Sequence, residues 1–369
     1  MAKELSFIEK LKKELVGVAK VTALSDPANE VQYEPSGILM LDWIAGRGLP
    51  RGRWIEIFGM ESGGKSLLAA LIAASYQRRG ETVVWIDMER SIDPVWYKRL
   101  GLDTDSLIVA QPDSGEGAFE TLQKVLESGQ VGLVVIDSIA SMATDDELEE
   151  EAGHKNMAIL ARLLSNELRK LNGKLADSKC TVILINQVRS TMALTRYSAN
   201  ETTTGGKALP FYASLRFRVT KSTEPGSYIQ DENGKYMAHT IKIKNIKNKT
   251  SSPNLTGQFM LIYDGGPDNR AALVALATEK GYITTAPGGW YYINFNGQKI
   301  AKKGEKALIE ALAENKDLQN FLFDALNVHK IYRNMFEIDK REVISASGLA
   351  EIAKLPEEEE VVKPKKARK

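Results

Sequence analysis

The feature that most constrains the fold is an eight-residue, glycine-rich motif near position 60. An alternating polar and apolar segment at 53–58 precedes it, and a run of helix-forming residues at 67–74 follows it. A strand, a loop of this kind and a helix, in that order, distinguish a phosphate-binding loop from an incidental glycine-rich turn. Its backbone N–H groups and the positive end of the helix dipole can surround phosphate oxygens. The motif reads G-x-x-x-x-G-K-S and consists of Gly59, Met60, Glu61, Ser62, Gly63, Gly64, Lys65 and Ser66.

This motif predicts that the chain binds a nucleoside triphosphate together with Mg²⁺. Lys65 would reach the β- and γ-phosphates, and the Ser66 hydroxyl would hold the metal ion. A second apolar segment, 132–137, ends in Asp137, which we expect to hold Mg²⁺ through a water. The alternative for Asp137 is an N-cap or turn aspartate after a strand.

Two other apolar segments end in polar side chains. Glu89 follows the segment 82–87, and Gln187 follows the segment 181–186. Because ligands in open α/β sheets lie at the carboxyl ends of the strands, both side chains are candidates for the nucleotide site. Glu89 would orient or deprotonate the water that attacks the γ-phosphate, and Gln187 would sense that phosphate. A solvated loop carboxylate is the alternative for Glu89.

The segment 188–209 carries little apolar pattern but contains Arg189, Arg196, Lys207 and paired glycines. Long loops without secondary structure in compact domains tend to be functional or disordered. Threonines, glycines and cations together can contact a phosphate backbone, so this segment is a candidate DNA contact. A mobile surface loop without a ligand is the alternative.

The pattern of strands and helices predicts an α/β fold with a mostly parallel sheet covered on both faces. We expect four parts. An N-terminal arm at 1–33 would contain a helix at 7–16 and a solitary strand at 19–24. A nucleotide-binding core at 34–265, a small α+β domain at 266–355 and a charged, disordered tail at 356–369 would follow. The arm would pack on the main body or on a neighbouring subunit. The predicted strands of the core are 54–58, 82–87, 107–110, 132–137, 181–186 and 215–220, and 163–175 is an amphipathic helix.

Bulk composition narrows the class of protein. The chain has 369 residues and a net charge of +1, so nucleic-acid binding would have to come from local clusters of charge. Its single cysteine, Cys180, excludes an internal disulfide framework and a four-cysteine zinc site, and its apolar surroundings favour a buried thiol. The sequence contains no signal peptide and no stretch of about 20 apolar residues. These features predict a cytoplasmic protein with no membrane partner.

Seven strings in order make the chain similar to the bacterial and phage RecA-type DNA strand-exchange recombinases. The resemblance runs from about residue 35 to residue 259. The strings are Gly59–Ser66, Asp93-Pro94, Gln111-Pro112-Asp113, Asn186-Gln187-Val188-Arg189, Glu201–Gly206, Phe211-Tyr212-Ala213-Ser214 and Lys247-Asn248-Lys249. The resemblance implies a RecA-like P-loop NTPase core that uses ATP and Mg²⁺.

The resemblance also implies roles for individual residues. It implies that Glu89 is the catalytic glutamate. Asp93 and Trp96 would contact the adenine, with Trp96 in place of a tyrosine. Gln187 would link the nucleotide state to the DNA-binding loop. It implies two DNA-facing loops, 153–157 and 188–209, and a subunit interface near Phe211. The DNA contacts it implies are Met157, Arg162, Ser165, Arg169, Arg189, Thr202, Gly205 and Gly206.

Lys247 and Lys249 match lysines that reach the nucleotide of the adjacent subunit. A spacing of two on a strand puts both side chains on one face, where two ammonium groups could reach one phosphate chain. A solvated lysine pair on an exposed strand is the alternative that the residues alone would favour.

These implications add up to an ATP-dependent homologous recombinase. Such a protein forms a helical filament on single-stranded DNA, pairs it with homologous duplex DNA, exchanges strands and hydrolyses ATP in a DNA-stimulated manner. Single-strand-binding and mediator proteins are possible partners. Two classes of helicase are alternatives. Replicative helicases share the core but carry an extra N-terminal helical domain. RadA-like repair helicases carry a four-cysteine zinc site, which the single cysteine of this chain excludes. A nucleotide-gated scaffold filament would bind ATP but would not need Glu89.

Overall fold

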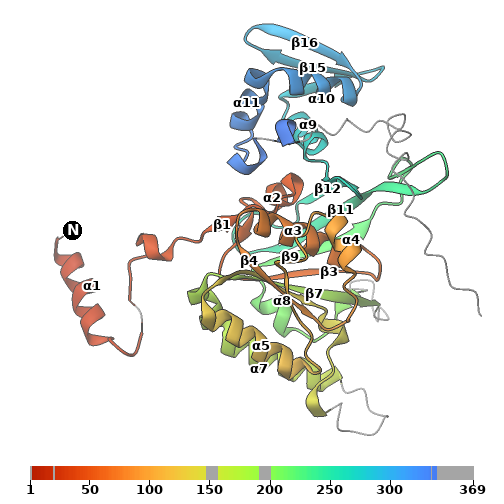
Figure 1. Ribbon diagram of the computed structural model, residues 1–369. Coiled ribbons are helices and arrows are strands. Elements are labelled where there is room, and N and C mark those ends of the chain that lie inside the picture. The colour runs from red at the N-terminus through yellow and green to blue at the C-terminus, as the bar shows by residue number, and fades with distance from the viewer. Residues whose placement is uncertain (1, 20, 147–156, 191–200, 334, 339–369) are drawn as a thin grey trace, which may run out of the picture.

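A large mixed sheet organises the molecule (Figure 1). The computed structural model describes residues 2–19, 21–146, 157–190, 201–333 and 335–338. The strand order along the sheet is β13-β12-β11-β9-β3-β7-β6-β4-β5, with β10 paired to β11 and β8 paired to β7. Neighbouring strands from β9 to β5 are parallel, and β11, β12 and β13 continue the sheet antiparallel. The strands are β3 (Trp54–Gly59), β4 (Thr82–Asp87), β5 (Ile108–Ala110), β6 (Val131–Asp137), β7 (Thr181–Ser190), β8 (Glu201–Thr203), β9 (Leu215–Lys221), β10 (Tyr228–Gln230), β11 (Tyr236–Asn248), β12 (Thr256–Ile262) and β13 (Gly266–Pro267).

Helices cover both faces of the parallel part of the sheet, as predicted from its continuous apolar strands. Alternate residues of each strand point to opposite faces, so Leu133 and Val135 of β6 join one core while Val134 and Ile136 join the other. The first core includes α3, and the second includes α5 and α7, which lie below the sheet in Figure 1. The helices of this part are α2 (Leu39–Ala45), α3 (Lys65–Arg78), α4 (Pro94–Arg99), α5 (Gly115–Ser128), η2 (Ile139–Ser141), α7 (Met157–Ser178) and α8 (Ala208–Tyr212).

The residues after β13 form helices around a small antiparallel sheet, β14-β15-β16. Leu273, Ile293 and Phe323 of this part belong to the same continuous hydrophobic cluster as Ile57 of β3. The elements are α9 (Asn269–Glu279), β14 (Ile283–Ala286), β15 (Trp290–Phe295), β16 (Gln298–Lys303), α10 (Glu305–Glu314), α11 (Lys316–Ala325), η3 (Lys330–Tyr332) and α12 (Met335–Ile338).

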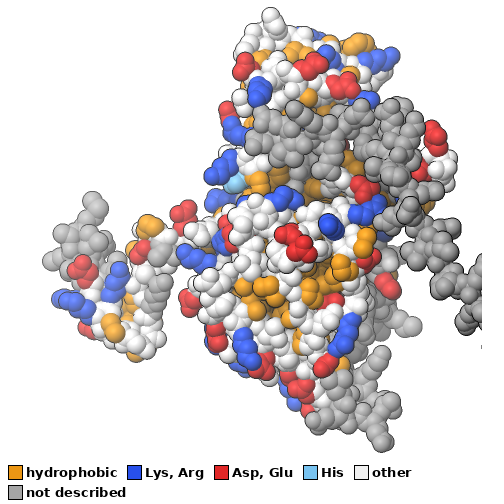
Figure 2. Space-filling view, viewed as in Figure 1, with side chains coloured by type: hydrophobic (Ala, Val, Ile, Leu, Met, Phe, Trp, Pro, Cys, Tyr) orange, Lys and Arg blue, Asp and Glu red, His pale blue; other side chains and the backbone are white. Residues whose placement is uncertain are grey.

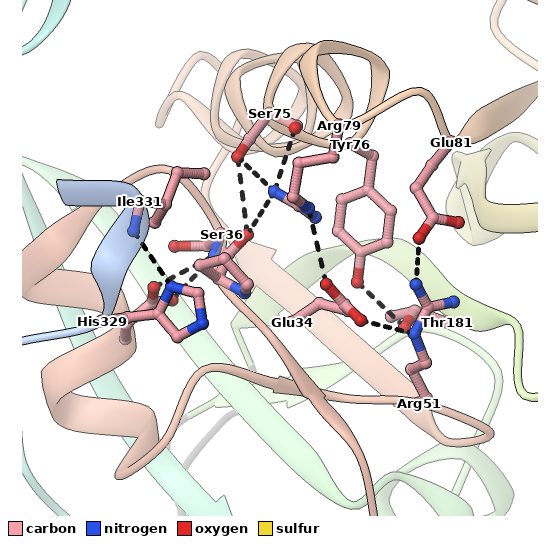
Figure 3. A network of polar contacts seen from close by, with 12 residues as sticks. Glu34, Ser36, Arg51, Ser75, Tyr76, Arg79, Glu81, Thr181, His329 and Ile331 are labelled. Atoms are coloured by element: carbon pink, nitrogen blue, oxygen red, sulfur yellow. Dashed lines mark hydrogen bonds and ion pairs between the residues drawn. The ribbon is translucent and has the colours of Figure 1, made fainter. Parts of the chain in front are cut away.

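A polar network ties the start of the core to α3 and β7 (Figure 3). Glu34 accepts a 2.7 Å hydrogen bond from Arg51 Nε and lies 3.4 Å from Arg79 Nε. Arg79 directly follows α3, and within that helix the Tyr76 hydroxyl donates to Thr181 Oγ1 at 3.0 Å. These partly and fully buried contacts fix the register of α3 against the sheet, and α3 carries the phosphate loop at its other end.

The N-terminal arm differs in part from the prediction. Its helix, α1 (Ala2–Glu14), lies apart from the main body in Figure 1, and η1 (Pro27–Asn29) and β1 (Tyr33–Glu34) follow. Strand β1 pairs antiparallel with β2 (Leu49–Pro50) of the core. The predicted strand at 19–24 is wrong, because the described residues 21–24 belong to no strand. A strand needs a hydrogen-bonded neighbour, and no described segment of this chain pairs with that stretch.

The prediction of little structure over 188–209 is also wrong for the residues that the structure describes. Strand β7 continues past 186 to Ser190 and pairs antiparallel with β8, which matches Arg189 with Thr202. Residues 191–200, including Arg196, lie outside the described part. Apolar pattern could not reveal this hairpin, because its strands are held by backbone pairing rather than by one buried face.

Cys180 is a buried free thiol, as its apolar surroundings predicted, and burial raises its pKa to about 12. Charged side chains of both signs are interspersed on the face of the main body seen in Figure 2, in keeping with the net charge of +1. In the part of the chain that the structure describes, no helix has both the length and the apolar composition to cross a membrane.

Candidate nucleotide and DNA site

The phosphate motif lies where the sequence predicts, between the end of β3 and the start of α3. Gly59 ends β3, and a Cβ atom there would meet the carbonyl oxygen of Val219 at 2.3 Å, so only glycine fits. Lys65 begins α3 and donates a 2.8 Å hydrogen bond from Nζ to the carbonyl oxygen of Met60. Burial lowers the pKa of Lys65, although the nearby carboxylates of Asp137, Glu89 and Glu61 act in the opposite direction.

A cavity of about 560 Å³ opens over this loop. Its walls come from the loop itself and α3, from α4, and from the carboxyl ends of β4 and β6. Residues of β7, β9 and β11 and the residue after β12 complete them. The parallel register explains the convergence, because β3 pairs Gly59 with Gln187 and β4 pairs Asp87 with Asp137. The lining residues are Glu61, Ser62, Gly63, Gly64, Lys65, Ser66, Leu67, Glu89, Ser91, Trp96, Tyr97, Asp137, Gln187, Lys221, His239 and Tyr263.

Two carboxylates lie on the wall beside Lys65. The pKa of Asp137 is raised to about 7, chiefly by burial and also by the charges of Glu89 and Asp87, although a hydrogen bond from Ser66 and the charge of Lys65 act in the opposite direction. Glu89 is exposed and is held by hydrogen bonds to Oε1 from Ser138 Oγ at 2.6 Å and from Ser141 Oγ at 3.1 Å. The two serines orient Oε1, and no hydrogen bond from another described residue occupies Oε2, which can therefore accept from a substrate or a water.

Asp137 and Ser66 fit a hard divalent cation. Asp137 Oδ1 is buried and has no hydrogen-bond partner among the described residues, while the Ser66 hydroxyl bonds to the same carboxylate. Mg²⁺ prefers oxygen ligands and keeps several waters, so two protein oxygens beside a phosphate chain suit it. The described residues include no group of three or more His, Cys, Asp or Glu side chains arranged to hold a metal.

Aromatic rings form the wall farther along the cavity. Trp96 of α4 meets Tyr263 edge to face, with ring centroids 5.6 Å apart, and the Arg99 guanidinium lies 5.6 Å from the centre of the Trp96 ring. Asp93 is not a lining residue: its carboxylate caps α4 by accepting a 2.9 Å hydrogen bond from the Val95 N–H. The structure therefore brings Trp96 to the cavity but gives the Asp93 carboxylate a local partner on α4.

Gln187 lines the cavity at the point where β7 leaves the sheet and enters the hairpin. The adjacent Asn186 is fully buried, and its amide donates to Glu56 Oε1 and to the carbonyl oxygen of Thr204, both at 3.0 Å. The other oxygen of Glu56 accepts from Arg216 of β9. One buried polar network thus joins the nucleotide end of β7 to the base of the hairpin.

The residues assigned to DNA gather around α7 and the hairpin. Arg162, Ser165 and Arg169 are exposed on α7. The turn after β8 packs on the same helix: Gly205 has a φ of +86°, and a Cβ atom there would lie 2.1 Å from Leu164 Cδ1. This close approach brings Gly205 and Gly206 beside α7, which Met157 begins, while Arg189 and Thr202 face each other in the hairpin. Residues 153–156 of the first expected DNA-facing loop lie outside the described part.

Lys247 and Lys249 do not line the nucleotide cavity of their own chain. Lys247 Nζ donates to the carbonyl oxygens of Pro210 at 2.6 Å and Phe211 at 2.9 Å, and Lys249 Nζ donates to that of Phe211 at 3.1 Å. The two ammonium groups therefore lie together, as their spacing predicts. Burial and the neighbouring cations Lys249 and Arg216 lower the pKa of Lys247 to about 8, and the Phe211 ring beside them is 69% exposed.

Sequence reasoning missed several residues of the cavity and its supports. His239, Tyr263 and Lys221 come from β11, the residue after β12, and β9, and nothing in their local pattern marks them. Their position depends on the strand order β12-β11-β9-β3, which hydrophobic periodicity does not encode. Ser138 carried a usable signal, because it directly follows Asp137 at the carboxyl end of a strand.

Comparison with known proteins identifies chains that are similar to this one. The family model described as the RecA N-terminal domain matches residues 3–268. The chain is 37% identical to "Protein RecA" of Nostoc punctiforme over 348 residues, which cover 94% of this chain and 91% of that protein. It is 39% identical to "Protein RecA" of Francisella tularensis subsp. novicida over 309 residues, or 83% and 84% of the two chains. A crystal structure of the RadB recombinase aligns at a TM-score of 0.46 and 21% identity, over 62% of this chain and 96% of that one.

A family model that covers most of the chain and relatives that match nearly its whole length leave one assignment for this nucleotide-binding fold. The chain belongs to the RecA family of ATP-dependent DNA strand-exchange recombinases.

Proposed function

We propose that this chain assembles on single-stranded DNA as a helical filament, pairs it with a homologous duplex and exchanges strands, using ATP and Mg²⁺. The observation that carries the proposal is the cavity in which Lys65, Glu89 and Gln187 converge from three elements. A phosphate loop, a candidate base and a γ-phosphate sensor in one cavity are the parts that a DNA-responsive ATPase needs. Glu89, held by two serines, favours a hydrolytic enzyme over a scaffold that only binds nucleotide.

In this proposal the phosphate loop, Gly59 to Ser66, binds the triphosphate, and Lys65 leaves the Met60 carbonyl to reach the β- and γ-phosphates. Ser66 and Asp137 hold Mg²⁺, which when bound offsets charge on the phosphates. Glu89 orients the attacking water, and Trp96, with Asp93 nearby on α4, receives the base. Gln187 donates to the γ-phosphate.

The proposed DNA surface is the face shared by α7 and the β7–β8 hairpin. Its members are Met157, Arg162, Ser165, Arg169, Arg189, Thr202, Gly205 and Gly206. The exposed cations on α7 would contact backbone phosphates, and the two glycines would allow close approach of the DNA backbone. The packing of Gly205 against Leu164 supports a single surface rather than two independent loops.

The proposed subunit contact centres on Phe211, Lys247 and Lys249. Since these lysines lie away from the cavity of their own chain, they are available to the nucleotide of a neighbour, where they would act as trans cations. The arm at 1–33 would dock on the adjacent subunit, while 34–265 forms the ATPase core, 266–355 a small C-terminal domain and 356–369 a charged tail. We also propose that the protein acts in the cytoplasm and is loaded by single-strand-binding or mediator proteins.

The test measures ATP turnover with and without single-stranded DNA and images the same samples by electron microscopy. We expect DNA-stimulated turnover and helical filaments with a non-hydrolysable ATP analogue. Lys65→Ala should lose both while its melting temperature without nucleotide stays nearly unchanged, since its side chain mainly serves the ligand. DNA-independent turnover, or nucleotide binding without filaments on DNA, would contradict the proposal.

A further inference from the structure

His239 is an unusual member of the cavity wall. Its side chain is 2% exposed, and neither ring nitrogen has a hydrogen-bond partner among the described residues. Buried polar side chains in folded proteins are nearly always hydrogen-bonded, and one that is not calls for an explanation such as a missing ligand. His239 lines the same cavity as Lys65, so the groups it lacks can come from the nucleotide.

The imidazole is held at the aromatic end of that cavity. It stacks on Tyr228, with centroids 6.2 Å apart and planes 19° apart, and contacts Tyr263 at 5.4 Å. Tyr263 in turn meets Trp96, the residue proposed to receive the base. A row of rings therefore runs from Trp96 to His239 along one wall, and His239 is a hydrogen-bonding group within an otherwise apolar row.

The charge environment separates His239 from the phosphate end. Among the described residues, Lys221 is the charged side chain that acts on His239, whereas the carboxylates of Asp137, Glu89 and Glu61 act on Lys65. Burial, and then Lys221, lower the pKa of His239 to about 4, so the ring is neutral at physiological pH. A neutral imidazole offers one N–H donor and one nitrogen acceptor, which suits an uncharged nucleoside group better than a phosphate.

We infer that His239 is a specificity-determining residue that hydrogen-bonds the nucleoside half of the bound nucleotide. The partner is a group that can donate and accept, either the edge of the purine or a ribose hydroxyl. This inference rests on the proposed nucleotide site and adds a contact that neither the phosphate loop nor Trp96 supplies. Without His239, the cavity would still bind the phosphates and stack the base but would distinguish nucleosides less well.

The experiment compares the wild type with His239→Leu, which keeps a similar volume and removes both ring nitrogens. Binding of ATP and of inorganic tripolyphosphate is measured by calorimetry without DNA. We expect ATP affinity to fall roughly 5- to 30-fold, the effect of one or two lost neutral hydrogen bonds, while tripolyphosphate affinity stays within about 2-fold. His329→Leu is the matched control, because His329 directly precedes η3 and does not line the cavity; it should bind ATP as the wild type does.

Two analogues identify the partner group. Purine riboside triphosphate lacks the 6-amino group of adenine, and 2′-deoxyATP lacks a ribose hydroxyl. In the wild type, one of them should bind more weakly than ATP, and that difference should vanish in His239→Leu. His239→Asn and His239→Gln each restore a donor and an acceptor near one ring nitrogen, and one of them should recover part of the affinity.

Unchanged ATP affinity in His239→Leu, with wild-type folding, overturns the inference. So does an equal loss for ATP and tripolyphosphate, which would mean general damage to the cavity. If the leucine variant does not fold, the asparagine and glutamine variants take its place. Recovery of ATP affinity in one of them supports the inference, and equal binding of ATP and both analogues contradicts it. A wild type that binds ATP but shows no DNA-stimulated turnover would refute the proposed function and leave the binding test of His239 intact.

Discussion

The side-chain amide of Asn186 donates a 3.0 Å hydrogen bond to the backbone carbonyl of Thr204, 18 residues further along the chain. That bond joins the end of the sheet, beside Gln187, to the turn that follows the hairpin. The same amide holds Glu56, whose carboxylate also binds Arg216. The wall of the nucleotide cavity and the proposed DNA surface therefore share one buried polar network.

We predict that Asn186→Ala weakens the coupling between DNA and ATP turnover. The change leaves Glu56 Oε1 and the Thr204 carbonyl without this donor, at a cost of about 1–3 kcal/mol in the free energy of unfolding. Turnover without DNA should persist, while its stimulation by single-stranded DNA should fall several-fold. Thr204→Ala is the control: it keeps the backbone carbonyl and should keep the stimulation. Equal stimulation in Asn186→Ala would show that the network is only structural.

Glu89→Gln should slow ATP hydrolysis by at least about 10²-fold, the scale of a lost general base, while ATP and DNA binding persist. The variant should accumulate stable filaments, seen by electron microscopy. Ser141→Ala removes one of the two hydrogen bonds to Glu89 and should slow hydrolysis much less. Wild-type turnover in Glu89→Gln would assign the base to another residue.

Mixing two inactive variants tests the trans lysines. Lys247→Ala/Lys249→Ala and Glu89→Gln should each be nearly inactive alone. In mixed filaments, some interfaces pair an intact Glu89 with intact lysines of the neighbour, so partial ATP turnover should return. The test requires proof of co-assembly, for example by energy transfer between labelled subunits. Co-assembled filaments that never recover turnover would rule out action across the interface.

A buried acid in the structure predicts an unusual pH dependence of stability. Asp42 of α2 accepts hydrogen bonds from the Tyr332 hydroxyl and, at 2.9 Å, from the Ser36 N–H. Burial nevertheless raises its pKa from 3.8 to about 6. Between these two values the folded chain holds more protons than the unfolded chain, so this group makes stability fall as pH rises from about 4 to 6.

Asp42→Asn should remove this contribution, which is at most about 1.4 kcal/mol per pH unit. Urea unfolding at a series of pH values from 4 to 7 should show a larger loss of stability with rising pH in the wild type than in the variant. Asp113→Asn removes an exposed carboxylate paired with Arg90 and should leave the slope unchanged. Identical slopes for wild type and Asp42→Asn would refute the assignment.

The sequence predicted those parts of the site whose signal is local. The phosphate loop, Asp137 and Glu89 each follow an apolar strand, and a parallel sheet brings such strand ends to one edge. The mostly parallel sheet and its two covered faces also followed from continuous apolar strands. These inferences need only the periodicity of apolar residues along the sequence and the rule that ligands lie at the carboxyl ends of strands.

Features that depend on long-range pairing could not be predicted from pattern. His239 reaches the cavity because β11 lies two strands from β3, and Asp42 meets Tyr332 across 290 positions. The prediction of a strand at 19–24 was wrong for the same reason, because a strand forms only where another strand pairs with it, whatever its intrinsic propensity. The hairpin after β7 was missed because few apolar residues mark it.

Strand β7 passes without a break from the centre of the sheet, past the nucleotide cavity and into the hairpin with β8, and it ends at Ser190. An extended, hydrogen-bonded strand is stiff along its length. A displacement of Gln187 would therefore move Arg189 with it, because both residues belong to one strand and no folding or unfolding step separates them. In the function proposed above, loss of the γ-phosphate would therefore change the DNA contact through this one strand.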